Sequence, residues 1–378
     1  MAVGGLGTVK TLHIDGEHTW RGGEQQVMYL TAGLKARGHG VTVACQPGSP
    51  LAERARAAGL DVAEVRMRGE ADFRAVLALR RIIRRGKFDI VHMHTSHAHA
   101  LGCAAAALAR RGRTIVSRRV DFGIAANLIG GFKYRHGVDR FIAISQAVRR
   151  VLVDGGVEPA RVAVVHSGID LSRFDGVPPG RIREEYAVPQ DARVIGNVAA
   201  VADHKGQRYL LAAMPRVLAA EPMARLFVVG DGELRGALEA QVKELDIGHA
   251  VTFTGFRTDV PQWLAFFDVF IMSSHLEGLC TSVLDALAMR RPVVASAAGG
   301  LPEIIRHEVT GLLVPPKEPE PLADAIVRLL RDRELGRRLA EAGRRHVEAE
   351  FSAESMVEGT LRVYHEVMDE GQSAGGES

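Results

Sequence analysis

Hydrophobic and polar positions along this chain form two alternating patterns, short apolar runs and longer amphipathic segments. The apolar runs, about four to seven residues long, end at polar or glycine-bearing loops, as expected for buried strands of a parallel sheet. In the first half the predicted strands are Val9–Asp15, Val41–Cys45, Asp61–Arg66, Asp89–His94, Thr114–Ser117 and Phe141–Ser145. The amphipathic segments predict helices at 24–37, 51–58, 73–85, 98–110 and 146–152. This rhythm is typical of an α/β domain with a doubly wound parallel sheet.

Residues 171–192 interrupt the rhythm with prolines and glycines among charged residues, which predicts an interdomain linker. The two patterns then return. The second set of predicted strands is 194–198, 226–229, 251–254, 269–273, 293–296 and 311–314, and the predicted helices are 207–218, 234–245, 263–266, 302–305, 322–330, 334–350 and 352–368.

These patterns predict two Rossmann-like domains in tandem. We place the first at residues 1–180 and the second at 181–350. A helix at 351–368 is expected to pack back towards the first domain, and the polar tail at 369–378 is expected to be disordered. Ligands of such sheets bind at the carboxyl ends of the strands, so we expect the two domains to face a central cleft.

Composition supports a globular protein of two domains. The 378 residues are 47% hydrophobic and 25% charged, and the three cysteines are far apart with no CxxC pair. A reducing compartment fits this cysteine pattern, whereas a structural zinc site does not. Neither a secretory-signal pattern nor an apolar run of about 18 residues occurs, so we expect a cytoplasmic location.

The charge of the chain is unevenly distributed. Residues 66–150 contain 18 Lys and Arg against 5 Asp and Glu, although the whole chain carries only +3. This excess predicts an anionic partner for the first domain, namely a phospholipid surface or a phosphorylated acceptor. A solvated basic face without a partner is the alternative. Nucleic acid is disfavoured, since no aromatic interleaving or binding motif accompanies the arginines.

The most informative stretch for chemistry runs from His275 to Leu287. It places Glu277 in a loop and Asp285 two turns inside the following helix, with Thr281 or Ser282 as the expected N-cap. Two carboxylates separated by the free N–H groups of a helix start suit a sugar nucleotide, which has hydroxyl groups at both ends and a diphosphate between them. An exposed Glu and a buried Asp in an ordinary helix remain the alternative.

Glycine pairs begin two other predicted helices. Gly22 and Gly23 follow Trp20 and Arg21, where backbone without side chains can approach a phosphate or an attacking oxygen. Residues 299–303, Gly-Gly-Leu-Pro-Glu, form a second helix start with exposed backbone. A turn that simply requires glycine explains the pair Gly22 and Gly23 equally well.

Histidine and lysine residues follow two predicted strands. Four histidines lie within residues 92–99, and His94 at the strand end is expected to bind a sugar hydroxyl in its neutral form. Their spacing does not match a metal site, so we expect no bound metal. Lys205, in a loop that opens a helix, can neutralise a diphosphate leaving group, although most lysines are simply surface residues.

Several classes of enzyme are disfavoured by the motifs that are missing. The chain contains neither a GxSxG motif nor a Cys/His arrangement typical of a hydrolase nucleophile. It also lacks a DxD motif, so a metal-bridged diphosphate has no evident ligands.

In their order and spacing these motifs resemble glycosyltransferase family 4, the retaining enzymes of GT-B fold. The resemblance covers residues 9–368. It rests on Lys205-Gly206, Glu277 with Asp285, residues 299–303, residues 165–174 and residues 307–315. It implies cell-surface glycan or lipopolysaccharide biosynthesis at the inner face of the cytoplasmic membrane. It also implies a nucleotide-sugar donor as substrate, no separate cofactor, and a glycan or lipid-linked acceptor.

The resemblance also implies roles for individual residues. Glu277, His94 and Lys205 would be catalytic, with Glu277 and His94 at the donor sugar and Lys205 at the diphosphate. Asp285 would hold the ribose. The remaining donor-binding positions would be Gly22, Gly23, Gly255, Phe256, Gly278, Leu279, Cys280, Thr281 and Ser282.

Three positions depart from the family pattern. Ala200 stands where the family usually has an arginine, Asp285 is one methylene shorter than the usual Glu, and Arg290 replaces a frequent glycine. Transfer with retention by front-face attack is the expected reaction. A nucleotide-sugar epimerase and an inactive binding or scaffold protein are the alternatives, and the missing arginine favours the scaffold.

Overall fold

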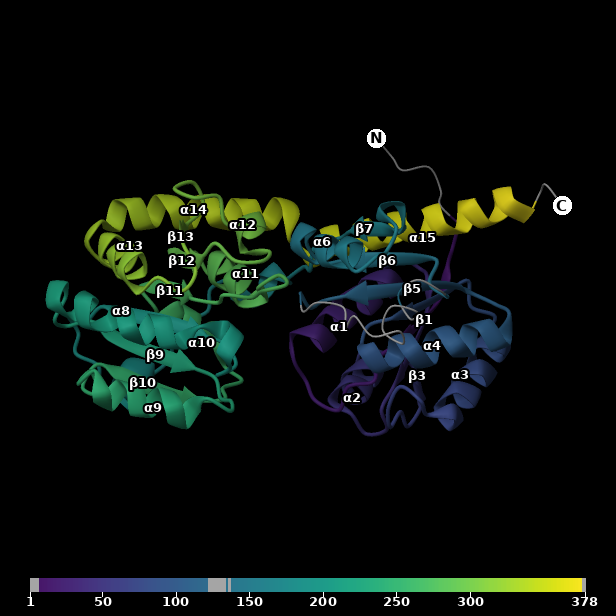
Figure 1. Cartoon of the computed structure of the whole chain (residues 1–378), viewed down its shortest axis with the longest axis horizontal. Coiled ribbons are helices and arrows are strands. Elements are labelled where there is room, and N and C mark those ends of the chain that lie inside the picture. Colours follow the sequence, from purple (N-terminus) through teal and green to yellow (C-terminus); the bar gives the residue numbers. More distant parts are fainter. Residues whose placement is uncertain (1–6, 122–133, 135–136, 376–378) are drawn as a thin grey trace. The chain divides into compact units, whose positions relative to one another are not determined.

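The structure is a computed structural model that describes residues 7–121, 134 and 137–375. The chain divides into two compact units (Figure 1). The first unit combines Met1–Gly168 with Ala353–Ser378, and the second is Ile169–Ser352.

The division between the units falls at residues 168 and 169, before the predicted position at 180. Ile169 donates its N–H to the carbonyl of Phe351 at 2.9 Å, so the two connecting segments run side by side. Residues 171–192 do not form a plain linker: they contain the 3-10 helix η2 (Leu171–Phe174) and α7 (Ile182–Glu185). Phe174 and Ile182 are buried, which fixes this segment to the second unit.

A seven-stranded parallel sheet forms the centre of the first unit, in the order β3-β2-β1-β4-β5-β6-β7. The strands are β1 (Lys10–Ile14), β2 (Gly40–Cys45), β3 (Asp61–Glu64), β4 (Ile90–Met93), β5 (Arg113–Arg118), β6 (Arg140–Ala143) and β7 (Val162–Val164). The helices are α1 (Gly22–Ala36), α2 (Pro50–Ala57), α3 (Phe73–Gly86), α4 (Ser96–Ala109), α6 (Gln146–Asp154) and α15 (Ala353–Gly375), with the 3-10 helix η1 (Pro159–Arg161). The strand order reverses between β1 and β4, where such sheets bind ligands.

The second unit repeats this architecture with six parallel strands, in the order β10-β9-β8-β11-β12-β13. Its strands are β8 (Val194–Val198), β9 (Arg225–Val229), β10 (Val251–Gly255), β11 (Val269–Met272), β12 (Val293–Ser296) and β13 (Leu312–Val314). Its remaining helices are η3 (Asp203–Lys205), α8 (Gln207–Ala220), α9 (Arg235–Glu244), α10 (Val260–Phe266), α11 (Thr281–Ala288), α12 (Leu301–Ile304), α13 (Pro319–Arg331) and α14 (Arg333–Glu350). Here the order reverses between β8 and β11. The prediction of two doubly wound parallel-sheet domains is confirmed.

Local sequence explains why helices start directly after strands. Hydroxyl or carboxylate side chains of Ser49, Asp72, Thr95 and Ser145 accept the N–H three residues ahead and so cap four helices of the first unit. The short strand β7 was not predicted, because three residues at a sheet edge give too little pattern.

Helix α15 returns to the first unit and packs against α1. Gly33 of α1 permits this approach, since a Cβ at this position would lie 2.6 Å from Val357. Val357 and Tyr364 join the apolar core of the unit. The helix extends beyond the predicted end at residue 368 and is described to Gly375.

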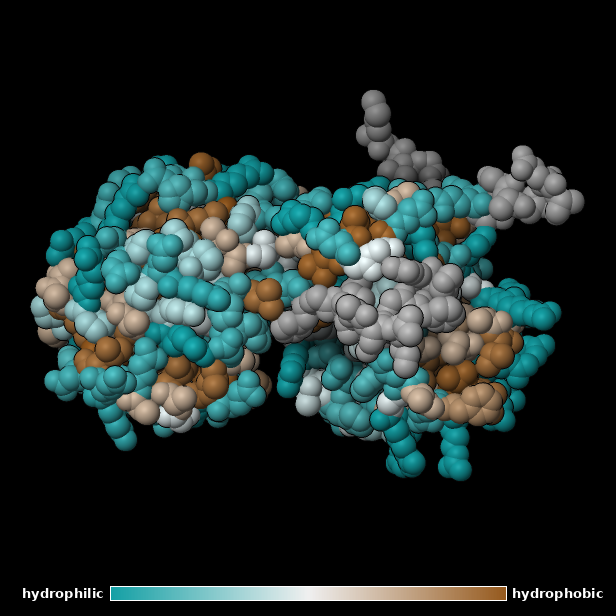
Figure 2. All heavy atoms as spheres, viewed as in Figure 1, coloured by the Kyte–Doolittle hydropathy of each residue, from teal (hydrophilic) through white to brown (hydrophobic). Residues whose placement is uncertain are grey.

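Each sheet is covered by apolar residues on both faces. The core of the second unit includes Ile195, Leu226 and Ile271 on strands and Leu211 and Ile326 on helices, all fully buried. Hydrophilic side chains cover most of the visible surface (Figure 2). Over the described ranges, every helix is too short or too polar to cross a bilayer.

Candidate functional site

In the second unit, Lys205 and Glu277 meet at the point where the strand order reverses. Lys205 ends the 3-10 helix η3 that follows β8, and Glu277 lies in the loop after β11. Lys205 Nζ is 2.6 Å from Glu277 Oε2, and Ser274 Oγ donates to the same oxygen at 3.2 Å. Both charged side chains are largely buried, with 17% and 10% of their surfaces exposed. The structure therefore brings together two of the predicted catalytic residues.

Two glycines hold the loops around this ion pair in close contact. Gly206 and Gly299 have left-handed backbones, with φ of 65° and 54°. A Cβ at Gly206 would lie 2.1 Å from the Ser273 carbonyl oxygen, and one at Gly299 would lie 1.8 Å from the Glu277 carbonyl oxygen. Gly300 N–H donates to that Glu277 oxygen at 2.9 Å. The predicted glycine helix start at 299–303 thus fixes the backbone of Glu277.

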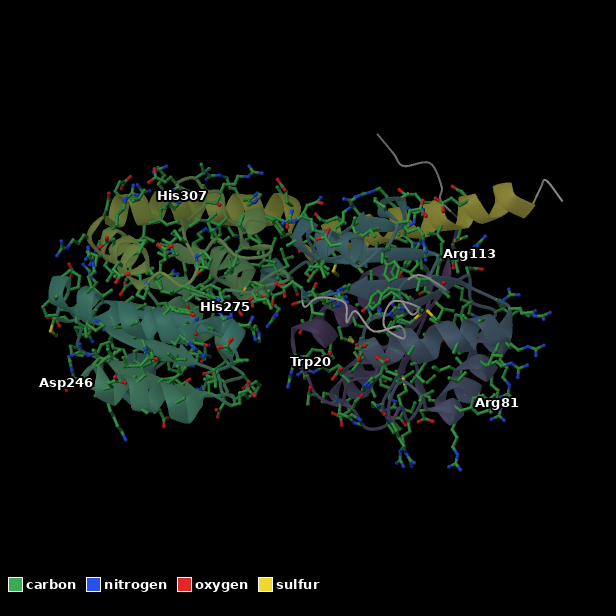
Figure 3. The ribbon with its side chains drawn as sticks, in the orientation of Figure 1. Trp20, Arg81, Arg113, Asp246, His275 and His307 are labelled. Atoms are coloured by element: carbon green, nitrogen blue, oxygen red, sulfur yellow. The ribbon has the colours of Figure 1, made fainter. Side chains whose placement is uncertain are left out.

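A further hydrogen bond links the Lys205 loop to the Glu277 loop. His275, labelled in Figure 3, donates its N–H to the carbonyl of His204 at 3.0 Å. Ala200 stands at the position of the missing arginine, and its carbonyl accepts from the Gln207 side chain at 2.9 Å. Position 200 therefore contributes no charge to this end of the sheet, and Lys205 supplies the cation that faces Glu277.

Helix α11 begins one residue earlier than predicted, with Cys280 instead of Thr281 or Ser282 at the N-cap. The N-cap prediction is wrong because Thr281 already has helical geometry. Burial raises the pKa of the Cys280 thiol to about 12, so the thiol is neutral. The helix has no side-chain cap hydrogen bond, which suits its first turn to a bound anion. Gly278, Leu279 and Cys280 are buried beside it.

Asp285 lies inside α11 and is partly buried. Burial raises the pKa of its carboxyl to about 7, and the positive charge of Arg173 on η2 opposes this shift. A carboxyl that titrates near neutrality can both donate to and accept from hydroxyl groups. This chemistry suits a ribose diol.

Gly255 and Phe256 follow strand β10. Gly255 has a φ of 74°, and its carbonyl accepts the Gly230 N–H at 2.9 Å. This bond fixes the turn from which Phe256 projects, with 74% of its surface exposed. An exposed aromatic ring on a fixed turn is available to a planar base.

In the first unit, polar residues gather where the strand order reverses between β1 and β4. Asp15 follows β1, His94 follows β4 and Arg119 follows β5. Burial raises the pKa of Asp15 to about 7 and lowers the pKa of Arg119 to about 10; Asp15 and Glu24 partly offset the Arg119 shift. A Cβ at Gly23 would lie 3.9 Å from Arg119 Cδ, so the glycine loop borders the same cluster.

The start of α1 holds Gly22 in place. Arg21 is the N-cap, and its N–H donates to Glu24 Oε2 at 2.6 Å. Trp20, labelled in Figure 3, is covered by the Arg54 guanidinium at 3.9 Å from the ring centroid. The glycine pair is therefore carried by a loop that is fixed on both sides.

A chain of hydrogen bonds determines the tautomer of His94. Arg119 can only donate, so His94 Nδ1 accepts at 3.5 Å and the proton is on Nε2. His94 Nε2 then donates to His13 Nδ1 at 3.0 Å, and His13 Nε2 donates to Thr11 Oγ1 at 3.1 Å. The Thr11 hydroxyl donates to the Gly40 carbonyl at 3.2 Å. Because Nδ1 has a single lone pair, a sugar hydroxyl that reaches His94 would have to donate to Nδ1 in place of Arg119.

His92 ties this cluster to the C-terminal helix. Its Nδ1 lies 2.7 Å from the Tyr364 hydroxyl of α15, and its Nε2 lies 2.8 Å from Ser117 Oγ. The rings of His92 and His94 lie 4.1 Å apart between centroids. Burial, together with neighbouring positive groups, holds the pKa of both histidines well below its usual range, so both are neutral.

Sequence reasoning missed His13, Tyr364, Asp15 and Arg119. Of these, only His13 could have been predicted from the sequence pattern. Thr11 and His13 alternate on β1 as His92 and His94 do around β4, so their side chains share one face of the sheet. The other two histidines of the 92–99 stretch are elsewhere: His97 is exposed, and the ring of His99 packs 6.0 Å from that of Phe141.

His13, His92 and His94 also have the composition of a metal site. Their ligand atoms lie within 4.8 Å of one another. Every ring nitrogen of these three residues already has a hydrogen-bond partner, and Arg119 adds a positive charge beside His94. A cation would have to displace those bonds, so the arrangement fits a hydrogen-bonded cluster better than a metal centre.

Two family models match this chain. The model described as Glycosyltransferase Family 4 matches residues 20–173, and the model described as Glycosyl transferases group 1 matches residues 192–332. The two matches fall on the two sheets, one in each unit.

Individual relatives agree with the family models. N-acetyl-alpha-D-glucosaminyl L-malate synthase of Bacillus anthracis is 27% identical over 76% of this chain and 77% of its own length. A GDP-mannose-dependent monoacylated alpha-(1-6)-phosphatidylinositol monomannoside mannosyltransferase of Corynebacterium glutamicum is 34% identical, over 51% of this chain and 53% of its own length.

Solved structures share the fold. HepE of Anabaena, solved in complex with UDP and glucose, has a TM-score of 0.84 at 20% identity and covers 95% of this chain and 100% of its own. The fold is GT-B, as the sequence predicted. The chain belongs to glycosyltransferase family 4.

Proposed function

We propose that this glycosyltransferase transfers a sugar from a nucleotide-sugar donor to a glycan or lipid-linked acceptor with retention of the anomeric configuration and without a metal ion. The observation that carries the proposal is the buried pair of Lys205 and Glu277, 2.6 Å apart. It lies at the carboxyl end of the sheet and in the same loop system as the uncapped start of α11. Such a cation beside a free helix start is suited to a departing diphosphate.

Each donor group has a proposed partner in the second unit. Lys205 and the first-turn amides at Thr281 and Ser282 would bind the diphosphate, and Asp285 would bind the ribose. Gly255 and Phe256 would contact the base, and Glu277 would accept hydrogen bonds from sugar hydroxyls. The ion pair between Lys205 and Glu277 supports these assignments, because a bound diphosphate can replace Glu277 as the partner of Lys205. Glu277 is then available to the sugar hydroxyls.

The proposed reaction forms one bond and breaks one. The acceptor oxygen attacks the anomeric carbon on the face that the diphosphate leaves. The bond from that carbon to the phosphate oxygen breaks, and the acceptor proton passes to the leaving diphosphate. The protein orients the two substrates and stabilises the negative charge, and these two effects account for most of the rate enhancement in a transfer of this kind.

The first unit would bind the acceptor. Gly22 and Gly23 would offer backbone near the donor phosphate and the acceptor, and His94 Nδ1 would accept from a hydroxyl of the donor sugar in place of Arg119. The names of relatives support the proposed classes of donor and acceptor: the Corynebacterium enzyme is named a GDP-mannose-dependent phosphatidylinositol monomannoside mannosyltransferase, and HepE was solved with UDP and glucose. A lipid-linked or phosphorylated acceptor also agrees with the basic charge of residues 66–150.

Two other functions are separable by experiment. A nucleotide-sugar epimerase would convert its donor without an acceptor, and a scaffold protein would bind no nucleotide sugar at all. The uncharged Ala200 favours the scaffold, whereas the paired Lys205 and Glu277 favour catalysis.

A thermal-shift panel of UDP-, GDP- and ADP-sugars, followed by mass spectrometry of reaction mixtures, tests the proposal. We expect one nucleotide class to raise Tm and to yield free nucleoside diphosphate when acceptor is supplied. A panel without any shift supports the scaffold, and an isomerised donor in the absence of acceptor supports the epimerase.

We also propose that the first unit binds an anionic membrane surface from the cytoplasmic side. Helix α3 carries exposed Arg74, Arg81, Arg84 and Arg85 opposite the buried Leu79 and Ile83. Arg81 is labelled on this helix in Figure 3. Cations of this kind are each worth about 1 kcal/mol at an anionic surface.

Flotation with phosphatidylglycerol vesicles tests this membrane proposal. We expect binding at low salt that is lost as ionic strength rises, and weaker binding after Arg81→Gln with Arg84→Gln. If the protein does not bind anionic vesicles at low salt, the proposed membrane contact is wrong.

A further inference from the structure

The second unit has a cavity at the end of its sheet opposite to the Lys205 and Glu277 site. Its volume is about 280 Å³. Arg193, Asp268 and Pro292 line it, and each directly precedes a strand: β8, β11 and β12. All strands of this sheet are parallel, so the donor-site loops leave from the other edge. The cavity is therefore separate from the site described above.

The lining of this cavity is dominated by arginine. Guanidinium groups come from the start of β8, from the segment after α11 and from the first two turns of α14. They belong to Arg193, Arg290, Arg291, Arg333 and Arg337. We call this lining the arginine cavity. Helix α14 packs against α11 and α13, which brings the three segments together (Figure 1).

The two carboxylates in the lining are already engaged. Asp268 Oδ2 accepts the Val194 N–H at 2.7 Å, and Glu341 pairs with Arg290 at 3.4 Å. Two carboxylates against five guanidinium groups leave an excess of positive charge in the lining. Neighbouring cations repel one another unless an anion or solvent compensates.

The arginines differ in how they are held. Arg291 donates to the carbonyls of Met289 and Phe267, at 3.1 and 3.0 Å, and Arg337 pairs with Glu334 at 2.8 Å. In the described part of the chain, the side chains of Arg193 and Arg333 have neither a hydrogen bond nor an ion pair. These two guanidinium groups are therefore available to a ligand, one half-buried and one exposed.

A simpler explanation accounts for one of these cations. Arg290 follows the last turn of α11 with a left-handed φ of 53°, and a cation there complements the negative end of the helix. Lys87 and Arg110 have the same conformation at the ends of α3 and α4. The helix dipole does not explain the arginines that reach the same cavity from β8 and α14. The positive start of α14 adds to their charge.

We propose that the arginine cavity binds a phosphate monoester. A phosphate dianion offers three acceptor oxygens, and planar guanidinium groups match them in pairs of hydrogen bonds. A volume of about 280 Å³ lies at the small end of ligand pockets, which suits a phosphate or a small sugar phosphate better than a complete nucleotide sugar. The proposal does not depend on the proposed transferase reaction.

Titration calorimetry with inorganic phosphate at constant ionic strength tests the site. The variants are the double variant Arg193→Gln with Arg333→Gln, and Arg216→Gln as a matched control. Arg216 is an exposed arginine on α8 outside the cavity, and it pairs with Asp324 at 2.7 Å. Because Lys205 could bind phosphate as well, Lys205→Ala is titrated in parallel.

We expect the double variant to raise the Kd for phosphate at least about tenfold. Arg216→Gln and Lys205→Ala should leave it within about twofold. Unchanged melting temperatures would show that the double variant is folded. Equal affinity in all proteins, a loss confined to Lys205→Ala, or no binding of phosphate or vesicles would each overturn the proposal.

A second arm separates a soluble phosphate from a lipid headgroup. Glycerol 3-phosphate is compared with vesicles that contain phosphatidic acid, and phosphatidylcholine vesicles serve as the blank. Binding of the soluble ester that depends on Arg193 and Arg333 identifies a metabolite site. Binding of vesicles alone with the same dependence identifies a headgroup site, and binding unaffected by both substitutions contradicts the proposal.

Discussion

The two units share one sheet topology but hold their polar groups at its carboxyl edge in opposite ways. In the second unit the groups lie in loops beyond the strands and are charged, as Lys205 and Glu277 show at 2.6 Å. In the first unit the histidines lie on or next to the strands and are neutral, as in the chain from His94 through His13 to Thr11, and the cation Arg119 stands at one end of that chain. The second unit thus holds two ions in contact at this end of its sheet, whereas the first unit holds neutral rings that are hydrogen-bonded to one another and, at one end, to Arg119.

This difference suits the two units to different tasks, ligand exchange in the second unit and fixed geometry in the first. A charged pair that is only partly removed from water can exchange its partner for a ligand, which a diphosphate would require. A buried network of neutral groups destabilises the fold unless every polar atom has a hydrogen-bond partner. Such a network therefore holds its side chains in fixed positions and does not readily give up a partner to a ligand. We therefore expect removal of a charged group in the second unit to change activity, and loss of a hydrogen-bond partner in the histidine network of the first unit to change stability.

The largest effect should follow removal of the cation in the second unit. Lys205→Ala is expected to lower kcat/KM for the donor by about 100- to 1,000-fold, because leaving-group charge is no longer neutralised. Lys243→Ala, on the exposed side of α9, is the control. Steady-state kinetics measure this effect. If kcat/KM of Lys205→Ala stays within about twofold of the unsubstituted protein, Lys205 has no role in the reaction.

The loop contact at Glu277 should be nearly as sensitive. Gly299→Ala would place a Cβ 1.8 Å from the Glu277 carbonyl oxygen, so the loop must move. We expect a loss of about 2–4 kcal/mol in unfolding free energy together with reduced activity. Gly236→Ala is the matched control, since a Cβ at Gly236 meets nothing within 4 Å.

Urea denaturation of the two glycine variants measures this difference. The control should be neutral or more stable by up to about 1 kcal/mol, because alanine favours the helix. Equal stability of both variants would mean that the close approach of the two loops is not required.

The neutral network of the first unit predicts a smaller effect on stability. Tyr364→Phe removes the hydroxyl that lies 2.7 Å from His92 Nδ1 and leaves a buried nitrogen unpaired. The expected cost is about 1–2 kcal/mol. Tyr186→Phe removes a hydroxyl from a partly buried ring of the second unit and should cost less. If thermal unfolding shows that Tyr186→Phe costs more stability than Tyr364→Phe, the hydrogen bond between Tyr364 and His92 does not stabilise the first unit as proposed.

The smallest effect concerns the pH dependence of stability. Burial raises the pKa of Asp285 to about 7, so the folded protein keeps a proton that the unfolded chain loses above about pH 4. The contribution of Asp285 to stability therefore falls as pH rises from about 4 to 7, and Asp15 contributes in the same direction from the first unit. Asp285→Asn removes one of these two contributions.

Thermal unfolding at two pH values isolates this contribution. At pH 8 we expect Asp285→Asn to raise Tm by at least about 2 °C, with little change at pH 4. Asp191→Asn, at an exposed position, is the control. An equal shift at both pH values would show that protonation is not the cause.

The sequence patterns predicted the second unit better than the first. Strands Val194–Val198 and Val293–Ser296 match their predicted bounds, and Lys205 and Glu277 were both singled out, because charged residues in glycine-rich loops after strands are visible locally. The pairing of His92 with Tyr364 was not predictable from local pattern. It joins residues that are far apart in the chain and depends on the return of α15 to the first unit.

The structure differs from the sequence prediction in two other places. The units divide between residues 168 and 169, where Ile169 contacts Phe351. The prolines and glycines of residues 171–192 led to a predicted boundary further along the chain. Cys280 became the N-cap of α11 in place of the expected Thr281 or Ser282. At the domain division a tertiary contact outweighed the local preference of the residues, whereas at α11 the helix includes Thr281 itself.

Proton NMR from the first turnover reports the anomeric configuration of sugar released from a nucleotide sugar, and this measurement tests the proposed transfer with retention most directly. Retention of configuration predicts that an α-linked donor yields the α-sugar first. The reaction should be lost in Lys205→Ala and Glu277→Gln and unchanged in Lys243→Ala. First release of the β-sugar, or turnover that is indifferent to both Lys205 and Glu277, would contradict it.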